Sequence, residues 1–217
     1  MTQDANNGSE YRQRIKHTTE KADKYQHRKA NKHKKEMALI ERALGEITGV
    51  KTFLDAPCGV GRASLLLEQK GYTVTGVDLG EGALKAAQET VEAVGSKVKI
   101  EKADLEQIPY EDKSFDACLC FRFIHHLSTA ELRDRIIGQL CRVSDRYVLI
   151  SYLSPMSVTS FRRSMKEKLQ KKISYQNRIA LSHLQKHFSD HGFSLKQDYA
   201  QLPLLHSLHL AVFERNS

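Results

Sequence analysis

The feature that limits the fold most is a glycine-rich turn between a short apolar run and a helical pattern. The apolar run ends at Asp55, and a helix is predicted to begin near Ala63. The turn between them contains Gly59 and Gly61. Because glycine accepts positive φ angles and has no side chain, such a turn lets the backbone approach a ligand closely. In an open α/β sheet ligands bind beyond the carboxyl ends of the strands, so the turn predicts a ligand site at the end of the first strand.

Two better-known glycine-rich loops do not fit this turn. The dinucleotide-binding pattern G-x-G-x-x-G requires a glycine three positions after Gly61, where Ser64 stands, and here an acid precedes the loop. A phosphate-binding P-loop requires Gly-Lys-Ser or Gly-Lys-Thr, which does not follow. The turn therefore indicates a different ligand.

Strand and helix patterns alternate along most of the chain. The predicted strands span residues 51–55, 72–77, 97–101, 115–121, 146–152, 193–199 and 207–214. The predicted helices after the turn span residues 63–69, 82–94, 129–140 and 178–190. Such alternation is typical of a parallel sheet with right-handed crossover connections, and the last two strands follow one another in hairpin order. We therefore predict an α/β fold.

Two basic segments stand outside this alternation. Residues 1–36 form a predicted helical extension, and residues 37–217 form the main domain with a basic amphipathic insertion at about 153–176. Residues 1–36 hold ten Lys/Arg against five Asp/Glu, and residues 161–178 hold seven against one, so together they exceed the formal net charge of +8. The favoured role of the insertion is to cover the mouth of the site. Contact with a membrane surface, and attraction of nucleic acid, stay open as alternatives.

Three acidic residues follow the first three predicted strands. Asp55 ends the first strand, Asp78 lies 23 residues further on at the end of the second, and segment 103–105, which contains Asp104, ends the third. An acid at the position of Asp78 can accept hydrogen bonds from both ribose hydroxyls of a nucleoside. Asp104 is placed to accept from the amino group of adenine, with the backbone N–H of Leu105 beside it for a ring nitrogen. Each acid alone is more often a turn or helix-cap residue, so the prediction of an adenosine-shaped slot depends on all three together.

The turn and these acids resemble a known family. The pattern D-x-x-C-G-x-G resembles motif I of the class I S-adenosylmethionine-dependent methyltransferases. Segment 104–116, with the letters D-L-E-Q-I-P-Y and S-F-D, is similar to a run in the family that includes the ubiquinone and menaquinone C-methyltransferases. The resemblance covers roughly residues 50–150. It implies a Rossmann-like sheet of seven mostly parallel strands, the last antiparallel, with helices on both faces and S-adenosyl-L-methionine as the cofactor.

The resemblance also implies roles for residues around this methyl donor. Asp55 would order the loop beneath the methionine part, and Arg28 is a candidate partner of the donor carboxylate. Phe121, with Arg122, would line the sulfonium and the acceptor pocket. The donor-binding residues that the resemblance implies are Arg28, Asp55, Ala56, Gly59, Gly61, Asp78, Leu79, Asp104, Leu105 and Phe121.

Two histidines are the predicted catalytic residues. Methyl transfer is a displacement from an already activated sulfonium, so the enzyme chiefly aligns the acceptor. A general base is needed when the acceptor is a hydroxyl or a carbon acid. His125 and His126 follow the fourth strand on the acceptor side, and either can titrate near neutral pH. The alternative is a structural histidine that caps the turn. Tyr152 and His206 are weaker pocket candidates.

The favoured function is a methyltransferase that acts on a small-molecule or lipid-linked acceptor. One alternative is an RNA or tRNA methyltransferase, although the Asn/Asp/Ser-Pro-Pro-Tyr/Phe motif is absent after the fourth strand. A second alternative is a non-catalytic binding module that keeps the fold. The histidines and the four cysteines lack metal-ligand spacing, so we expect no metal. Since no apolar run approaches the ~20 residues of a membrane span and no secretory signal is recognisable, we expect a cytoplasmic protein.

Overall fold

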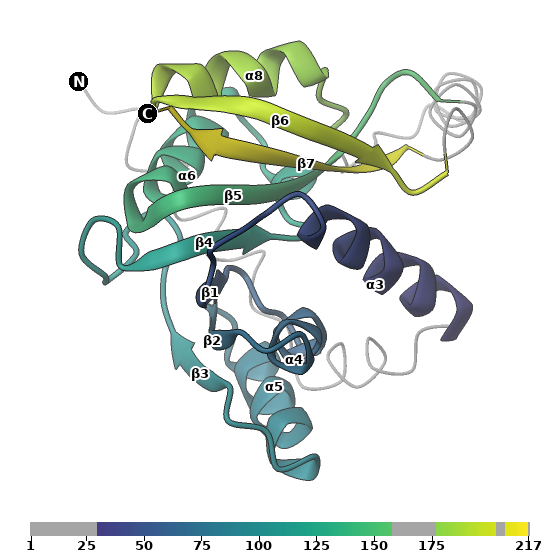
Figure 1. The fold of residues 1–217 in the computed structure, drawn as a ribbon, viewed down its shortest axis with the longest axis vertical. Coiled ribbons are helices and arrows are strands. Elements are labelled where there is room, and N and C mark those ends of the chain that lie inside the picture. The colour runs from purple at the N-terminus through teal and green to yellow at the C-terminus, as the bar shows by residue number, and fades with distance from the viewer. Residues whose placement is uncertain (1–29, 158–176, 203–206, 217) are drawn as a thin grey trace.

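The computed structural model describes residues 30–157, 177–202 and 207–216. Within these residues seven strands form one sheet in the order β3-β2-β1-β4-β5-β7-β6, with helices on both faces (Figure 1). The strands are β1 (Thr52–Asp55), β2 (Thr73–Asp78), β3 (Lys99–Lys102), β4 (Phe115–Cys120), β5 (Ser144–Leu153), β6 (Phe193–Ala200) and β7 (Leu208–Arg215). The helices are α3 (Ala30–Leu44), α4 (Arg62–Gln69), α5 (Glu81–Ala93), the 3-10 helix η1 (Ile124–His126), α6 (Ala130–Val143) and α8 (Leu181–Asp190).

The strand directions confirm the predicted fold class. Strands β3, β2, β1, β4 and β5 pair in parallel, and β7 pairs antiparallel with both β5 and β6. Because β7 is inserted between β5 and β6, the last strand of the chain is the one that reverses, as the resemblance implied. The helices here are too short or too polar for any of them to cross a membrane, within the part of the chain that the structure describes.

Two of the differences between the predicted and the observed element boundaries bear on the site. Strand β3 ends at Lys102, so Asp104 lies beyond the strand, in a turn bridged to Gln107. Helix α8 begins at Leu181 rather than at residue 178, because the N–H of Ile179 donates to the Leu153 carbonyl at 2.9 Å and holds this segment extended. The predicted extension up to residue 29 and residues 158–176 of the predicted insertion lie outside the described residues, so the division into these parts stays a prediction.

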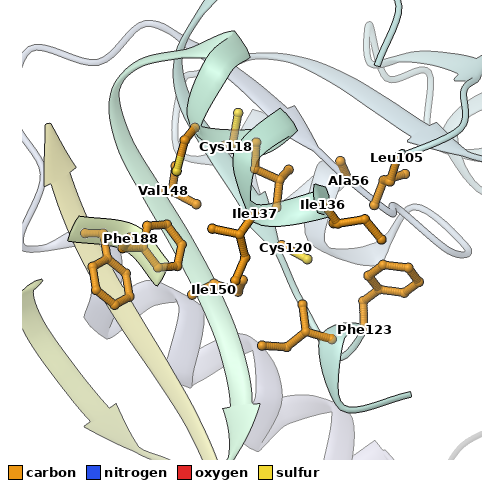
Figure 2. Packing of buried hydrophobic residues seen from close by; sticks show 14 of the residues in the cluster. Ala56, Leu105, Cys118, Cys120, Phe123, Ile136, Ile137, Val148, Ile150 and Phe188 are labelled. Atoms are coloured by element: carbon orange, nitrogen blue, oxygen red, sulfur yellow. The ribbon is translucent and has the colours of Figure 1, made fainter. Parts of the chain in front are cut away.

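Two apolar cores lie on the two faces of the sheet. Cys118 and Cys120 of β4 belong to one buried cluster, and their neighbour Leu119 belongs to the other, as expected when successive side chains of a strand alternate. Helices α6 and α8 cover the first cluster, in which Ile137 lies among residues of β4 and β5 (Figure 2). The ring of Phe188 stacks on Phe213 of β7. Helices α3, α4 and α5 contribute to the second cluster.

The parallel strands all end at one edge of the sheet. The turns that follow β1, β2, β4 and β5 gather at this edge, and α3 lies alongside it (Figure 1). The end of β6 and the start of β7 lie at the same edge, because β7 begins opposite the end of β5 and Ala200 pairs with His209. A ligand site formed by strand ends is therefore expected here.

Candidate functional site

The glycine-rich turn after β1 has the backbone conformation that its sequence requires. Gly59 and Gly61 have φ angles of 57° and 78°, in the region that favours glycine. The N–H of Cys58 donates to the Val77 carbonyl of β2 at 2.8 Å, which ties the turn to the neighbouring strand. A Cβ atom on Gly61 would lie 3.5 Å from Ala87 of α5, so the turn is also packed closely against that helix.

Asp55 is a buried acid at the end of β1. Its side chain is 1% exposed, and its Oδ2 accepts a 2.6 Å hydrogen bond from the hydroxyl of Ser64 in α4. Its Oδ1 is buried and has no hydrogen-bond partner among the residues that the structure describes. Burial raises the pKa of Asp55 to about 7, and the negative charge of Asp78 adds to this, while the Ser64 hydrogen bond acts in the opposite direction. The fold therefore holds a carboxyl group that lacks a partner for one oxygen.

Asp78 at the end of β2 connects two turns. Its Oδ2 accepts from the N–H of Gly59 at 3.0 Å, and its Oδ1 accepts from the N–H of Gly80 at 2.8 Å. The sequence predicted a contact with ribose, and it missed this second role of the carboxylate. Asp78 therefore orders the glycine-rich turn and the start of α5. Leu79, which lies between Asp78 and Gly80, is partly exposed.

Asp104 lies beside Asp78 at the same edge of the sheet. The N–H of Ala103 donates to the Asp78 carbonyl at 3.1 Å, so the chain after β3 passes next to the end of β2. The Oδ1 of Asp104 accepts from the N–H of Glu106 at 3.0 Å, and Leu105 is fully buried. Since β3, β2 and β1 are adjacent, the three predicted acids come together at neighbouring strand ends.

The end of β4 carries a buried ion pair that the sequence did not indicate. Arg122 has a φ of 59°, and its N–H donates to the Ser151 hydroxyl of β5 at 2.5 Å. Its guanidinium pairs with Glu36 of α3, whose side chain is 1% exposed. Phe121, next to Arg122, is partly buried and packs on the face that α3 covers. No local pattern could have revealed the pair, because its members are 86 residues apart.

Helix α3 also contacts the glycine-rich turn. His33 of α3 lies 3.2 Å from the guanidinium of Arg62, the first residue of α4. The pKa of His33 is lowered, first by burial and then by the charge of Arg62. Helix α3 thus spans the edge from the turn after β1 to the end of β4. Arg28, the predicted partner of the donor carboxylate, lies outside the described residues.

The two predicted catalytic histidines differ in exposure. Both lie in η1 after β4, and their rings are 4.2 Å apart. His125 is 1% exposed, and its carbonyl accepts from the N–H of Asn177 at 2.7 Å. His126 is exposed. The structure therefore places both after β4, as predicted, and leaves His126 as the accessible one.

A polar network that sequence reasoning missed joins the ends of three further strands. The Tyr152 hydroxyl of β5 donates to Oδ2 of Asp198 in β6 at 3.0 Å. The Nδ1 of His209 in β7 lies 2.8 Å from the same oxygen. Tyr152 is 1% exposed, and its pKa is raised by burial and by the charge of Asp198. Of the two pocket candidates, Tyr152 therefore lies in a built network, whereas His206 is outside the described residues.

Metal ligands are not assembled in the part of the chain that the structure describes. No three His, Cys, Asp or Glu side chains there form a group that could hold a metal ion. All four cysteines are free and buried.

The sequence matches a family and several relatives. The family model described as a methyltransferase domain matches residues 54–146. A Haemophilus influenzae protein without an assigned function is 30% identical over 135 residues, which is 61% of this chain and 53% of the relative. The ubiquinone biosynthesis O-methyltransferase of Nitrosospira multiformis is 35% identical over 93 residues, which is 42% of this chain and 39% of the relative. The matches thus span about half of these relatives' length, or less.

Solved structures show the same fold. The magnesium protoporphyrin IX methyltransferase of Synechocystis PCC 6803, solved with bound SAM, has a TM-score of 0.71 at 18% identity, with 97% of both chains covered. The same enzyme solved with bound SAH has a TM-score of 0.69 at 21% identity, covering 86% of this chain and 83% of that one. At such identities the likeness is one of fold.

Proposed function

Because this chain belongs to the class I S-adenosylmethionine-dependent methyltransferases, we propose that it transfers a methyl group from S-adenosylmethionine to a small-molecule acceptor. The observation that carries the proposal is the gathering of three acids and two positive-φ glycines at one edge of the sheet. The relatives named for ubiquinone biosynthesis support the acceptor class. The match to the Nitrosospira multiformis relative covers only 39% of its length, so its acceptor is assigned to this chain by similarity alone.

We assign Asp55 to the amino-acid end of the donor. A buried carboxylate oxygen without a partner is costly, and Oδ1 of Asp55 is such an atom. The ammonium group of the methionine part has the hydrogen-bond donors and the charge that this oxygen lacks. Ala56 and Gly59 lie beside Asp55 and offer backbone groups to the same end, while Gly61 allows the close approach of the turn.

We assign Asp78, Leu79, Asp104 and Leu105 to the nucleoside end. Each oxygen of Asp78 already accepts one backbone N–H, and a carboxylate oxygen retains a second lone pair for a ribose hydroxyl. Asp104 is half-buried next to Asp78, where the adenine would lie. Phe121 at the end of β4 would then face the sulfonium.

Catalysis would consist mainly of alignment. The bound donor supplies a methyl group activated by its sulfonium, and the protein holds the acceptor in line with it. An acceptor hydroxyl or carbon acid must also lose a proton. We propose the exposed His126, and next to it His125, as the groups that accept this proton.

Three further proposals concern the acceptor, membrane contact and location. A lipid-linked acceptor and contact of the basic insertion with a membrane surface are extensions of the small-molecule proposal. A cytoplasmic location is supported by four cysteines that are all free.

An RNA acceptor is the second candidate, and the two basic stretches favour it. If RNA binds, its affinity should fall steeply with salt, and a flat salt response would remove this candidate.

Donor binding tests the central proposal. We expect S-adenosylhomocysteine and S-adenosylmethionine to bind the full chain in calorimetry, and Asp78→Asn to weaken both. Asp112→Asn is the matched control, because Asp112 is exposed in the loop before β4 at the opposite edge of the sheet. Absence of measurable affinity in the folded wild-type protein would favour the non-catalytic binding module.

A further inference from the structure

The Tyr152–Asp198–His209 network is built from three strands that meet at the ligand edge of the sheet. Tyr152 lies next to the last residue of β5 and is in register with His209, the second residue of β7. Asp198 of β6 is in register with Ala211, two residues further along β7. The three side chains therefore share the face that α6 and α8 cover.

Hydrogen-bond chemistry fixes the orientation of this network. An ionised carboxylate only accepts, so the His209 nitrogen 2.8 Å from Asp198 is the protonated one. The other ring nitrogen, Nε2, is then an acceptor, and it has no hydrogen bond to any residue that the structure describes. The His209 side chain is 17% exposed, so a ligand can reach it.

A purely structural network would satisfy all its buried atoms. Oδ2 of Asp198 accepts from both Tyr152 and His209, while its Oδ1 is buried and has no hydrogen-bond partner in the described part of the chain. Unsatisfied buried acceptors are rare and costly in folded proteins. The network therefore carries a negative charge and two acceptor positions without donors, next to an apolar core in which Ile179 and Leu184 are buried.

The strand order gives the approximate distance between the network and the proposed site of methyl transfer. The Arg122 N–H at the end of β4 donates to Ser151, so β5 is the strand next to the proposed donor site. His209 on β7 is two strands from β4, which is about 10 Å at the usual strand spacing. This distance is too long for a group that takes a proton from the methylated atom, and it suits contact with the far end of an acceptor.

We propose that Tyr152, Asp198 and His209 form an acceptor subsite that takes a hydrogen-bond-donating group, an amine or a hydroxyl, about 10 Å from the methylated atom. The proposal rests on the proposed methyltransferase function. His209 is the residue that contacts the acceptor, through Nε2. Asp198 fixes its tautomer, and Tyr152 holds Asp198 in place.

Three probes that share a benzyl group test the subsite on the full chain saturated with S-adenosylhomocysteine. Benzylamine, benzyl alcohol and toluene present a cationic donor, a neutral donor and no donor on one scaffold. We expect the amine or the alcohol to shift the His209 side-chain nitrogen signals in NMR saturably, and to bind about tenfold more tightly than toluene, the scale of one hydrogen bond. Which of the two binds more tightly identifies the acceptor group. Equal binding of all three, or no saturable shift, would overturn the subsite.

Two substitutions of His209 separate its two nitrogens. His209→Asn keeps an amide donor near the position of Nδ1 and should lose the preference for the amine or alcohol. His209→Gln places its amide near the position of Nε2 and should keep part of that preference. Leu184→Ala, a change in the buried core outside the subsite, should leave the preference in place, and it controls for general loosening of the core. A preference that survives in His209→Asn would contradict the assignment.

Calorimetry on the same samples separates this proposal from the proposed function. If S-adenosylhomocysteine does not bind, the proposed methyltransferase function is refuted, and the subsite proposal that rests on it is refuted with it. If it binds and the probes show no preference, only the subsite is refuted.

Discussion

Replacing Asp55 by asparagine should change how the stability of the protein depends on pH. Asp55 is fully buried, and its pKa is raised from 3.8 to about 7, chiefly by burial. At 1.36 kcal/mol per pKa unit, this pKa difference corresponds to about 4 kcal/mol of unfolding free energy. Because the folded state binds the proton more tightly than the unfolded state does, this contribution is present in full below about pH 4. It is lost progressively between about pH 4 and pH 7, and it stays constant above.

The asparagine variant isolates this effect. Asparagine is neutral at every pH, and its carbonyl can still accept the hydrogen bond from Ser64. The unfolding free energy of the wild-type protein minus that of Asp55→Asn should therefore fall by about 4 kcal/mol from pH 4 to pH 8. Other titrating groups occur in both proteins and largely cancel in the difference.

Guanidinium chloride unfolding, followed by circular dichroism at several pH values, measures this difference. Asp112→Asn serves as the exposed control, and its difference from wild type should vary little over the same range. A difference for Asp55→Asn that is flat between pH 4 and pH 8 would show that the buried carboxyl is not held neutral, and the argument from burial would be refuted.

Three further predictions concern other parts of the molecule. Asp78→Ala leaves two backbone N–H groups without an acceptor and should weaken donor binding by about 1–3 kcal/mol in calorimetry; unchanged affinity would count against the ribose assignment. Glu36→Gln leaves the Arg122 charge buried without its partner and should lower the unfolding free energy by about 3 kcal/mol; a second change, Arg122→Met, should recover most of this loss, and no recovery would contradict the pair. Phe188→Ala removes a ring stacked 3.8 Å from the ring of Phe213 and should cost about 3–5 kcal/mol in denaturant unfolding; a loss below about 1 kcal/mol would mean that the core collapses around the gap.

The sequence could predict that the glycine-rich turn and the three acids of the candidate donor site lie together, because each of these signals is local. The glycine angles at Gly59 and Gly61 follow from a turn within a few residues, and the acids follow strands whose apolar pattern is clear. Asp104 was placed at a strand end, whereas β3 stops two residues earlier and the chain continues in a turn. The error is small because the segment still passes beside Asp78.

The other half of the site depends on register, which a single sequence does not determine. Strict alternation along β6 would place Leu195 and Asp198 on opposite faces of the sheet. A register irregularity between Leu195 and Gln197 brings both onto one face, so Asp198 meets Tyr152 and His209. Such an irregularity adds one residue to a strand and leaves no clear mark in the apolar pattern.

Helix α3 links the proposed donor site to the proposed acceptor subsite. Its His33 lies beside Arg62 at the start of α4, next to the proposed donor site, and its Arg42 donates to the Ala200 carbonyl at the end of β6. Glu46, just after the helix, accepts from the hydroxyl of Tyr199. A molecule that restrains one end of this helix therefore also restrains the other, so ligands bound at the proposed donor site and at the proposed acceptor subsite are expected to influence each other's affinity reciprocally.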